Sequence, residues 1–124
     1  MIDLIESQTT EFKQIWKDEY LKTVCALANT DGGEFYIGIC DNKEVIGLEN
    51  IESLLEILPN KINNRLGLMV DISVQQLENK NIIKIMIEKT YAPISFNGKF
   101  YKRSGSNTIS IIMNSQCLIL NEKA

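Results

Sequence analysis

The strongest constraint in the sequence is the abrupt change of pattern at residues 29–33, Asn-Thr-Asp-Gly-Gly. Residues 18–28 carry apolar side chains at helical spacing, with acids in the first turn. Residues 34–40 are largely apolar, as in a buried central strand, with Phe35, Ile37 and Ile39 on one face. Glycine and asparagine readily adopt the backbone conformation that ends a helix. The chain therefore passes from helix to strand within a few residues, which predicts a mixed α/β fold.

A second helix is predicted after Asn50, which is a favourable N-cap residue. Residues 51–58 carry an apolar stripe at helical spacing, and the pattern continues to residue 66. Pro59 lacks the amide proton that the helix interior needs, so we expect a break or a kink there. Gly67 is expected to end the helix.

Short strands account for most of the remaining chain. Asn97-Gly98 is the strongest hairpin turn in the sequence, and a second hairpin is expected around residues 78–81. Strands are predicted over residues 9–14, 44–48, 69–77, 82–87, 94–96 and 99–103. The apolar segment 108–120 fits either a strand or a helix. These elements predict one compact α+β domain over residues 1–124, with two main helices and a mixed, mostly antiparallel sheet.

Composition excludes several classes of function. The chain has no histidine, which removes Ser-His-Asp and Cys-His catalysis, and its three cysteines are too widely spaced for a structural zinc site. Acids near the N-terminus argue against a signal peptide, and no apolar stretch approaches the roughly 20 residues that span a bilayer. We therefore expect a cytoplasmic protein. Its net charge of −3 means that any nucleic-acid binding must depend on a local patch.

Three groups of residues are candidates for chemistry, and the first is acidic. Glu11 and Lys13 would project from the same face of a strand, with Glu6 nearby and Asp41 at the end of the central strand. Carboxylates beside a lysine suit metal-assisted cleavage of a phosphodiester, with Mg²⁺ or Mn²⁺ held by the acids. The alternative is a solvated pair of surface charges, which would contribute little to stability.

The second group is the loop that contains Asn29, Gly32 and Gly33. Its glycines would let the backbone approach a phosphate closely, although the loop matches neither a Walker A motif nor a dinucleotide fingerprint. The alternative is a plain helix stop. The third group joins cations to aromatic and hydroxyl side chains, which suits contact with phosphates and stacking on bases: Lys99, Tyr101, Lys102, Arg103 and Ser104. Its alternative is a hairpin edge that lysines protect from aggregation.

Taken together, these groups resemble the AlbA-type DNA-binding domain of the Schlafen superfamily, which also forms the front domain of bacterial regulators with a divergent AAA-type region. The resemblance covers nearly the whole chain. The segments that carry it are Glu6, Glu11-Phe12-Lys13, Lys22-Thr23, residues 26–33, Tyr36-Ile37-Gly38-Ile39, Asp41, residues 45–48, Ala92-Pro93 and residues 97–106.

The resemblance implies a nucleic-acid-binding domain that acts as a bacterial transcriptional regulator, either alone or as a fragment of a longer regulator. In animal Schlafen proteins, related domains form a metal-dependent RNA endonuclease whose three acids match Glu6, Glu11 and Asp41. Two departures stand out, the acidic charge balance and Lys102, where the family often has an uncharged residue. Three hypotheses follow. The first is a DNA-binding module that needs no cofactor and meets phosphates with Lys13, Lys99, Lys102 and Arg103. The second is an Mg²⁺- or Mn²⁺-dependent ribonuclease that uses Glu6, Glu11, Asp41 and Lys13. The third is a protein-interaction module that dimerises or docks on a partner.

Overall fold

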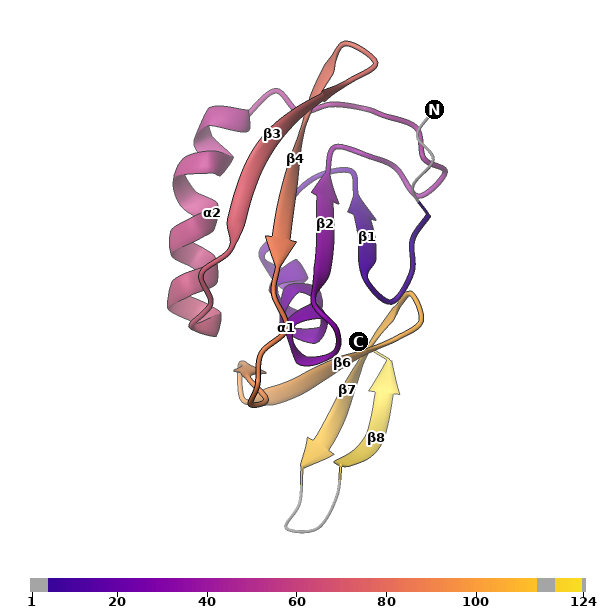
Figure 1. Cartoon of the computed structure of the whole chain (residues 1–124), viewed down its shortest axis with the longest axis vertical. Coiled ribbons are helices and arrows are strands. Elements are labelled where there is room, and N and C mark those ends of the chain that lie inside the picture. Colours follow the sequence, from indigo (N-terminus) through magenta and orange to yellow (C-terminus); the bar gives the residue numbers. More distant parts are fainter. Residues whose placement is uncertain (1–4, 114–117, 124) are drawn as a thin grey trace.

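The computed structural model describes residues 5–113 and 118–123, which form two α-helices, a short 3₁₀ helix and two four-stranded sheets (Figure 1). The first sheet has the order β1-β2-β4-β3: Thr10–Lys13, Gly33–Ile37, Lys80–Ile87 and Asp71–Leu77. The second has the order β5-β6-β7-β8: Ser95–Phe96, Lys99–Ser104, Asn107–Met113 and Leu118–Lys123. The α+β class is confirmed, and the strands divide between two sheets. No helix in the described part of the chain is long and apolar enough to cross a membrane.

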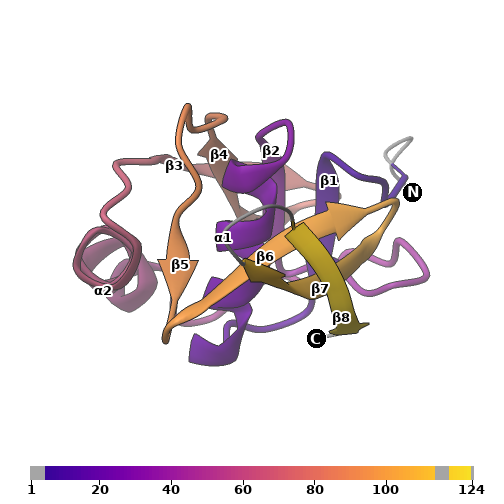
Figure 2. The ribbon, with the colours of Figure 1, turned by 90° about the horizontal axis from the view of Figure 1, so that it is seen from below.

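Helix α1, Leu21–Asn29, lies between the two sheets (Figure 2). Its residues 23–28 are all buried, because one side of the helix contacts β6 and the other faces the first sheet. Small side chains such as Ala26 and Ala28 allow this close approach. The acids expected in its first turn instead form a separate 3₁₀ helix, η1, over Asp18–Tyr20. The predicted helix stop after residue 28 is confirmed, and the Gly32 amide donates to the Leu27 carbonyl at 2.7 Å.

Helix α2, Ile51–Leu66, runs without interruption through Pro59, so the predicted break does not occur. Proline removes one hydrogen bond from a helix. The helix nevertheless buries apolar side chains in the same core on both sides of Pro59: Leu54 and Leu58 before it, Ile62 and Leu66 after it. Packing on both sides of Pro59 therefore holds the helix together. The helix ends at Gly67, as expected, in the left-handed conformation at φ +71°. Asn50 occupies the N-cap position but makes no side-chain hydrogen bond to the helix.

Both predicted hairpin turns are confirmed. Glu78 and Asn79 connect β3 to β4, Asn97 and Gly98 connect β5 to β6, and all four residues have positive φ angles, as a type I′ turn requires. The apolar segment near the C-terminus is extended and forms β7 and part of β8. The strand expected at residues 44–48 is absent except for one bridge between Ile39 and Val45.

The first sheet has an apolar cluster on each face. Phe35 and Ile37 pack with α1 and α2 in the larger cluster, whereas Ile39, beyond the end of β2, belongs to the smaller cluster on the opposite face. The expectation that these three side chains share one face is therefore wrong for Ile39. Strand β1 is parallel to β2 and stands at the edge of this sheet. Its Glu11 and Lys13 line one hollow together with residues of η1 and α1.

Candidate nucleic-acid interface

Arg103 joins the second sheet to the N-terminal strand. Its side chain is only 1% exposed, and its guanidinium donates to the Glu11 carboxylate at 2.9 Å. The same guanidinium also donates to four further acceptors: the carbonyls of Ser7, Gln8 and Thr10 and the hydroxyl of Thr108. The Arg103 amide donates to the Thr30 hydroxyl at 2.9 Å. This burial corrects the expectation that Arg103 contacts phosphate, because its donors are already occupied inside the fold.

Asn29 attaches α1 to the second sheet. Its side-chain amide donates to the Ile94 carbonyl at 2.9 Å and to the Tyr101 carbonyl at 2.8 Å, and its oxygen accepts the Ile94 amide at 2.8 Å. These three hydrogen bonds engage both the amide nitrogen and the oxygen of the side chain with the backbone of β6 and of the segment before β5. Asn29 therefore positions β5 and β6 and is not directed at a ligand, contrary to the expected binding role.

We expect Asn29→Ala to destabilise the chain by about 2 kcal/mol, because it leaves partly buried backbone groups without partners. The measurement is the urea midpoint of the variant against that of Asn42→Ala, which alters an exposed asparagine. Equal midpoints for the two variants would contradict the anchoring role of Asn29.

The two glycines of the loop lie against backbone. A Cβ added at Gly32 would come within 2.6 Å of the Ile87 carbonyl oxygen, and one added at Gly33 within 2.1 Å of the Thr9 carbonyl oxygen. The absence of side chains thus lets the loop pack on its neighbouring strands. This arrangement matches the plain helix stop rather than a loop open to phosphate.

The three candidate metal ligands do not come together. Glu6 and Glu11 do approach each other, since each accepts the Phe12 amide, at 3.3 and 3.2 Å. Asp41 is exposed and lines a hollow that neither Glu6 nor Glu11 lines. Within residues 5–113 and 118–123, no three acidic or cysteine side chains are grouped so that they could hold a metal ion. The expectation that all three acids converge is therefore wrong. The charge of Glu11 is instead balanced by Arg103.

Lys13 lies at the end of β1, above a cluster of aromatic rings. Its ammonium is 4.8 Å from the centre of the Tyr20 ring, a distance typical of a cation–π contact. Tyr20 packs in turn against Trp16 and Phe35. These rings support the ammonium from one side, while the side chain remains half-buried. Lys13 is therefore a positioned cation at the surface.

Three neighbouring hollows that share lining residues surround η1, and together we call them the η1 groove. The first, of 480 Å³, is lined by Lys13, Tyr20 and Asp41 among others. The second, of 290 Å³, shares Lys13 and Tyr20 with the first and adds Glu19, Lys22 and the β6–β7 turn. The third, of 330 Å³, shares Glu19 and Lys22 with the second and reaches Arg65 and Asn97. Lys13, Lys22 and Arg65 follow one another along this groove.

Three cations, Lys13, Lys22 and Arg65, line the η1 groove. They outnumber the two lining acids that have no ion pair in the described part of the chain, Glu19 and Asp41. Glu11 is paired with Arg103, and Asp18 with Lys61 at 2.7 Å. The hydrogen bond from Lys61 holds the pKa of Asp18 below its ordinary value, and the hydrogen bond from the Trp16 indole makes a smaller contribution in the same direction. In the described part of the chain, neither Lys13 nor Lys22 forms an ion pair. The groove therefore keeps positive charge that a phosphate could meet.

The predicted basic hairpin is divided between two faces of β6. Arg103 and Tyr101, 8% exposed, face α1, whereas Lys102 and Ser104 alternate with them and are exposed. Lys99 is also exposed, at the hairpin turn. Of the five hairpin residues expected to bind nucleic acid, only Tyr101 lines the η1 groove. The hairpin therefore does not present one continuous basic surface.

Sequence reasoning missed Lys22 and Arg65 as site residues. Lys22 is the one charged residue of α1. The sequence marks it as part of the family resemblance, but its position beside Lys13 as a candidate phosphate contact depends on the fold. Arg65 lies near the end of α2, where it donates to the Asn97 side chain at 2.9 Å and stacks over Phe96. No local pattern in the sequence indicates these contacts.

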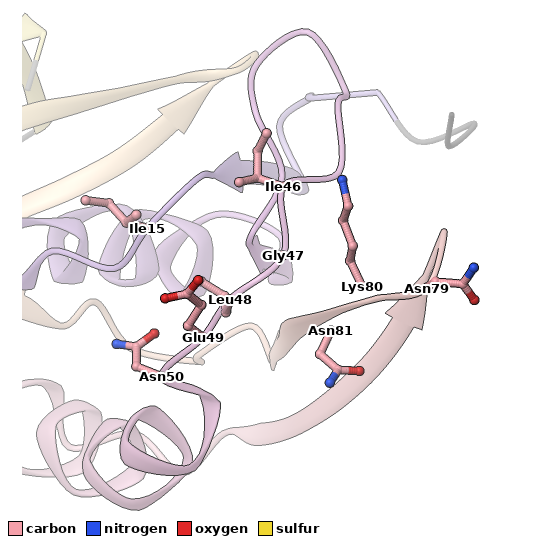
Figure 3. Close-up of a pocket in the computed structure, with 9 residues that line it drawn as sticks. All are labelled: Ile15, Ile46, Gly47, Leu48, Glu49, Asn50, Asn79, Lys80 and Asn81. Carbon is pink, nitrogen blue, oxygen red and sulfur yellow. The ribbon is translucent and has the colours of Figure 1, made fainter.

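Another hollow, of 610 Å³, shares no lining residue with the η1 groove (Figure 3). Lys80 lines it, but this ammonium donates to the Val45 carbonyl at 3.1 Å, and Figure 3 shows the side chain directed toward that loop. Asn79 points out of the hollow in the same view. With Glu49 at its wall as well, this hollow is a poorer site for phosphate than the η1 groove.

Comparison with known proteins identifies the family. The model of the Schlafen, AlbA_2 family matches residues 6–112. The DIP2311 protein from Corynebacterium diphtheriae has a similar fold, with 19% identity and a TM-score of 0.67 over 83% of this chain, which spans 22% of that protein's chain. The N-terminal domain of the "Putative ATP-dependent DNA Helicase RecG-related Protein" from Nitrosomonas europaea is also similar, with 18% identity and a TM-score of 0.60. That match covers 95% of this chain and 87% of the other. No functionally curated protein matches the chain. Because the family model spans most of the sequence and the structure has the corresponding α+β fold, the chain belongs to the Schlafen AlbA_2 family.

Proposed function

We propose that this chain binds nucleic acid and that the η1 groove receives the phosphate backbone. The observation that carries the proposal is the alignment of Lys13, Lys22 and Arg65 along one groove. Lysine and arginine side chains bind phosphates by releasing counterions, so a short row of them supplies sequence-independent affinity. The overall charge of −3 makes the rest of the surface a weak competitor for the same ligand.

Neutral donors complete the proposed interface. Ser106, in the β6–β7 turn, and Asn107, the first residue of β7, are exposed and line the hollow that contains Lys13 and Lys22. Hydroxyl and amide groups commonly bind phosphate oxygens and fix the register of a protein on its duplex. The turn is held in place by the hydrogen bond between Arg103 and Thr108, so its donors are positioned before any ligand arrives.

Duplex DNA is the ligand we propose, with regulation of transcription as the role. The similarity to a domain whose name refers to a DNA helicase supports DNA, and membership of the AlbA_2 family supports a nucleic-acid ligand in general. Metal-dependent cleavage of RNA has less support. Its three expected ligands, Glu6, Glu11 and Asp41, are not grouped around one point among the described residues. Glu11 is bound to Arg103, and Asp41 lines a hollow of the η1 groove that neither Glu6 nor Glu11 lines.

The test compares two double variants that remove the same number of charges. Lys13→Gln/Lys22→Gln changes the η1 groove, and Lys99→Gln/Lys102→Gln changes the exposed face of the hairpin. Binding of a fluorescent duplex is measured by anisotropy over a range of salt concentrations. We expect the groove variant to lower affinity for all sequences and to flatten the slope of log K against log salt by about two units, one for each lost phosphate contact.

The hairpin variant is the matched control, and its slope should change by less than about one unit. An equal loss in both variants would indicate diffuse attraction to lysines and would contradict a defined groove. Absence of salt-dependent binding by the unmodified chain would favour the interaction-module hypothesis. A parallel series with structured RNA and Mn²⁺ is expected to show no cleavage, and metal-dependent cleavage lost in Glu11→Gln would establish the ribonuclease instead.

A further inference from the structure

The two edge strands of the first sheet, β1 and β3, differ in whether their outward backbone groups form hydrogen bonds. At β1, the carbonyls of Thr9 and Lys13 accept hydrogen bonds from β2 and its continuation, so Thr10 and Phe12 present their backbone groups outward. Arg103 binds the Thr10 carbonyl, and the carboxylates of Glu6 and Glu11 accept the Phe12 amide. Charged side chains therefore occupy this edge and leave no row of backbone groups for another strand.

The opposite edge, β3, is open. It is seven residues long, and its register with β4 is regular along its whole length. No other described segment forms a hydrogen bond with the outer backbone groups of this strand. Such an edge is a template for pairing with a further strand, and proteins that avoid pairing protect it with lysine, proline or a bulge. Strand β3, Asp-Ile-Ser-Val-Gln-Gln-Leu, has none of these.

We propose that β3 pairs antiparallel with β3 of a second copy of this chain, which joins the two four-stranded sheets into one. Pairing that places Val74 opposite its own equivalent puts Ile72 opposite Gln76 and Ser73 opposite Gln75. Every residue from 72 to 77 is uncharged, so this register brings no like charges together. Val74 is 42% exposed, and the pair would cover its side chain at the twofold axis.

A second copy suits this edge better than a strand of another composition. The one charged residue of β3, Asp71, lies opposite the apolar Leu77 in this register, and residues 72–76 lie opposite one another. The strand can therefore pair with itself without opposing like charges. A pair of seven-residue strands buries less area than a standard interface, so the dimer should be weak and depend on concentration. The proposal stands independently of the η1 groove, which involves other elements.

The test is sedimentation velocity of the whole chain from about 1 μM to about 500 μM, a range in which small interfaces dissociate. We expect a shift from monomer to dimer. Hydrogen exchange at the two ends of this range should show the β3 amides that face away from β4 becoming more protected in the dimer. A chain that stays monomeric throughout, or a dimer without added protection in β3, would overturn the proposal.

Val74→Lys would place two ammonium groups opposite each other, and we expect it to weaken the dimer at least about tenfold. Val74→Thr keeps a neutral, β-branched side chain and should dimerise as the unmodified chain does. Far-ultraviolet circular dichroism verifies that both variants fold. If Val74→Lys folds and dimerises normally, the interface lies elsewhere. If it does not fold, the exchange measurement on the unmodified chain still decides.

Discussion

Replacing Arg103 with methionine is expected to destabilise the chain by about 3–5 kcal/mol, the range found when one partner of a buried ion pair is removed. The carboxylate of Glu11, whose side chain is 7% exposed, would remain without the cation that neutralises it. Three carbonyls of residues 7–10 would also lose a donor. Because small domains are stable by only about 5–15 kcal/mol, this loss should be visible as a large fall in the urea midpoint.

The matched control is Lys102→Met, one residue away on the exposed face of the same strand, which should change stability by no more than about 0.5 kcal/mol. The double variant Glu11→Gln/Arg103→Met should recover part of the loss, since it removes the buried charge as well. If Arg103→Met were as stable as Lys102→Met, Arg103 would not be the link between the two sheets.

Gly33→Ala is expected to destabilise the chain by about 2–5 kcal/mol. Two effects add: the backbone at φ +151° is rarely adopted by residues with a side chain, and the new Cβ would lie 2.1 Å from the Thr9 carbonyl oxygen. The Thr9 carbonyl lies just before β1 and accepts the Glu34 amide, so it cannot move without disturbing the β1–β2 pair. The measurement is again the urea midpoint.

Gly98→Ala separates the two effects. Gly98 also has a positive φ, +78°, but a Cβ there would meet nothing within 4 Å. It should therefore show only backbone strain, of about 1 kcal/mol. Equal losses of stability in the two variants would mean that the close contact with Thr9 relaxes easily. The loop would then not be packed tightly against its neighbouring strands.

Local chemistry was enough to predict the turns and the helix ends. Gly67, the Asn97-Gly98 turn and the stop after α1 all depend on residues that adopt positive φ angles or lack a side chain, and such preferences act within a few residues. Pro59 shows where local preference fails. The core contacts of Leu54 and Ile62 hold α2 continuous, and no rule confined to the residues around a proline can anticipate them.

The candidate site was harder to predict because charges in a sequence carry no sign of burial. Arg103 and Lys102 are adjacent cations, yet one faces α1 and the other faces solvent. Which face of β6 is covered depends on α1, whose Asn29 and Thr30 are more than 70 residues away in sequence. Lys22 and Arg65 gained their place beside Lys13 in the same way, through long-range packing around η1.

Binding of DNA in the η1 groove is tested most directly by an NMR titration of the isotope-labelled chain with a short DNA duplex at low salt. We expect the largest amide shifts to follow the η1 groove, at Lys13, Lys22 and Asn107, and to disappear as the salt concentration is raised. Shifts confined to the exposed face of β6, at Lys99 and Lys102, would contradict this expectation. So would a spectrum that the duplex leaves unchanged.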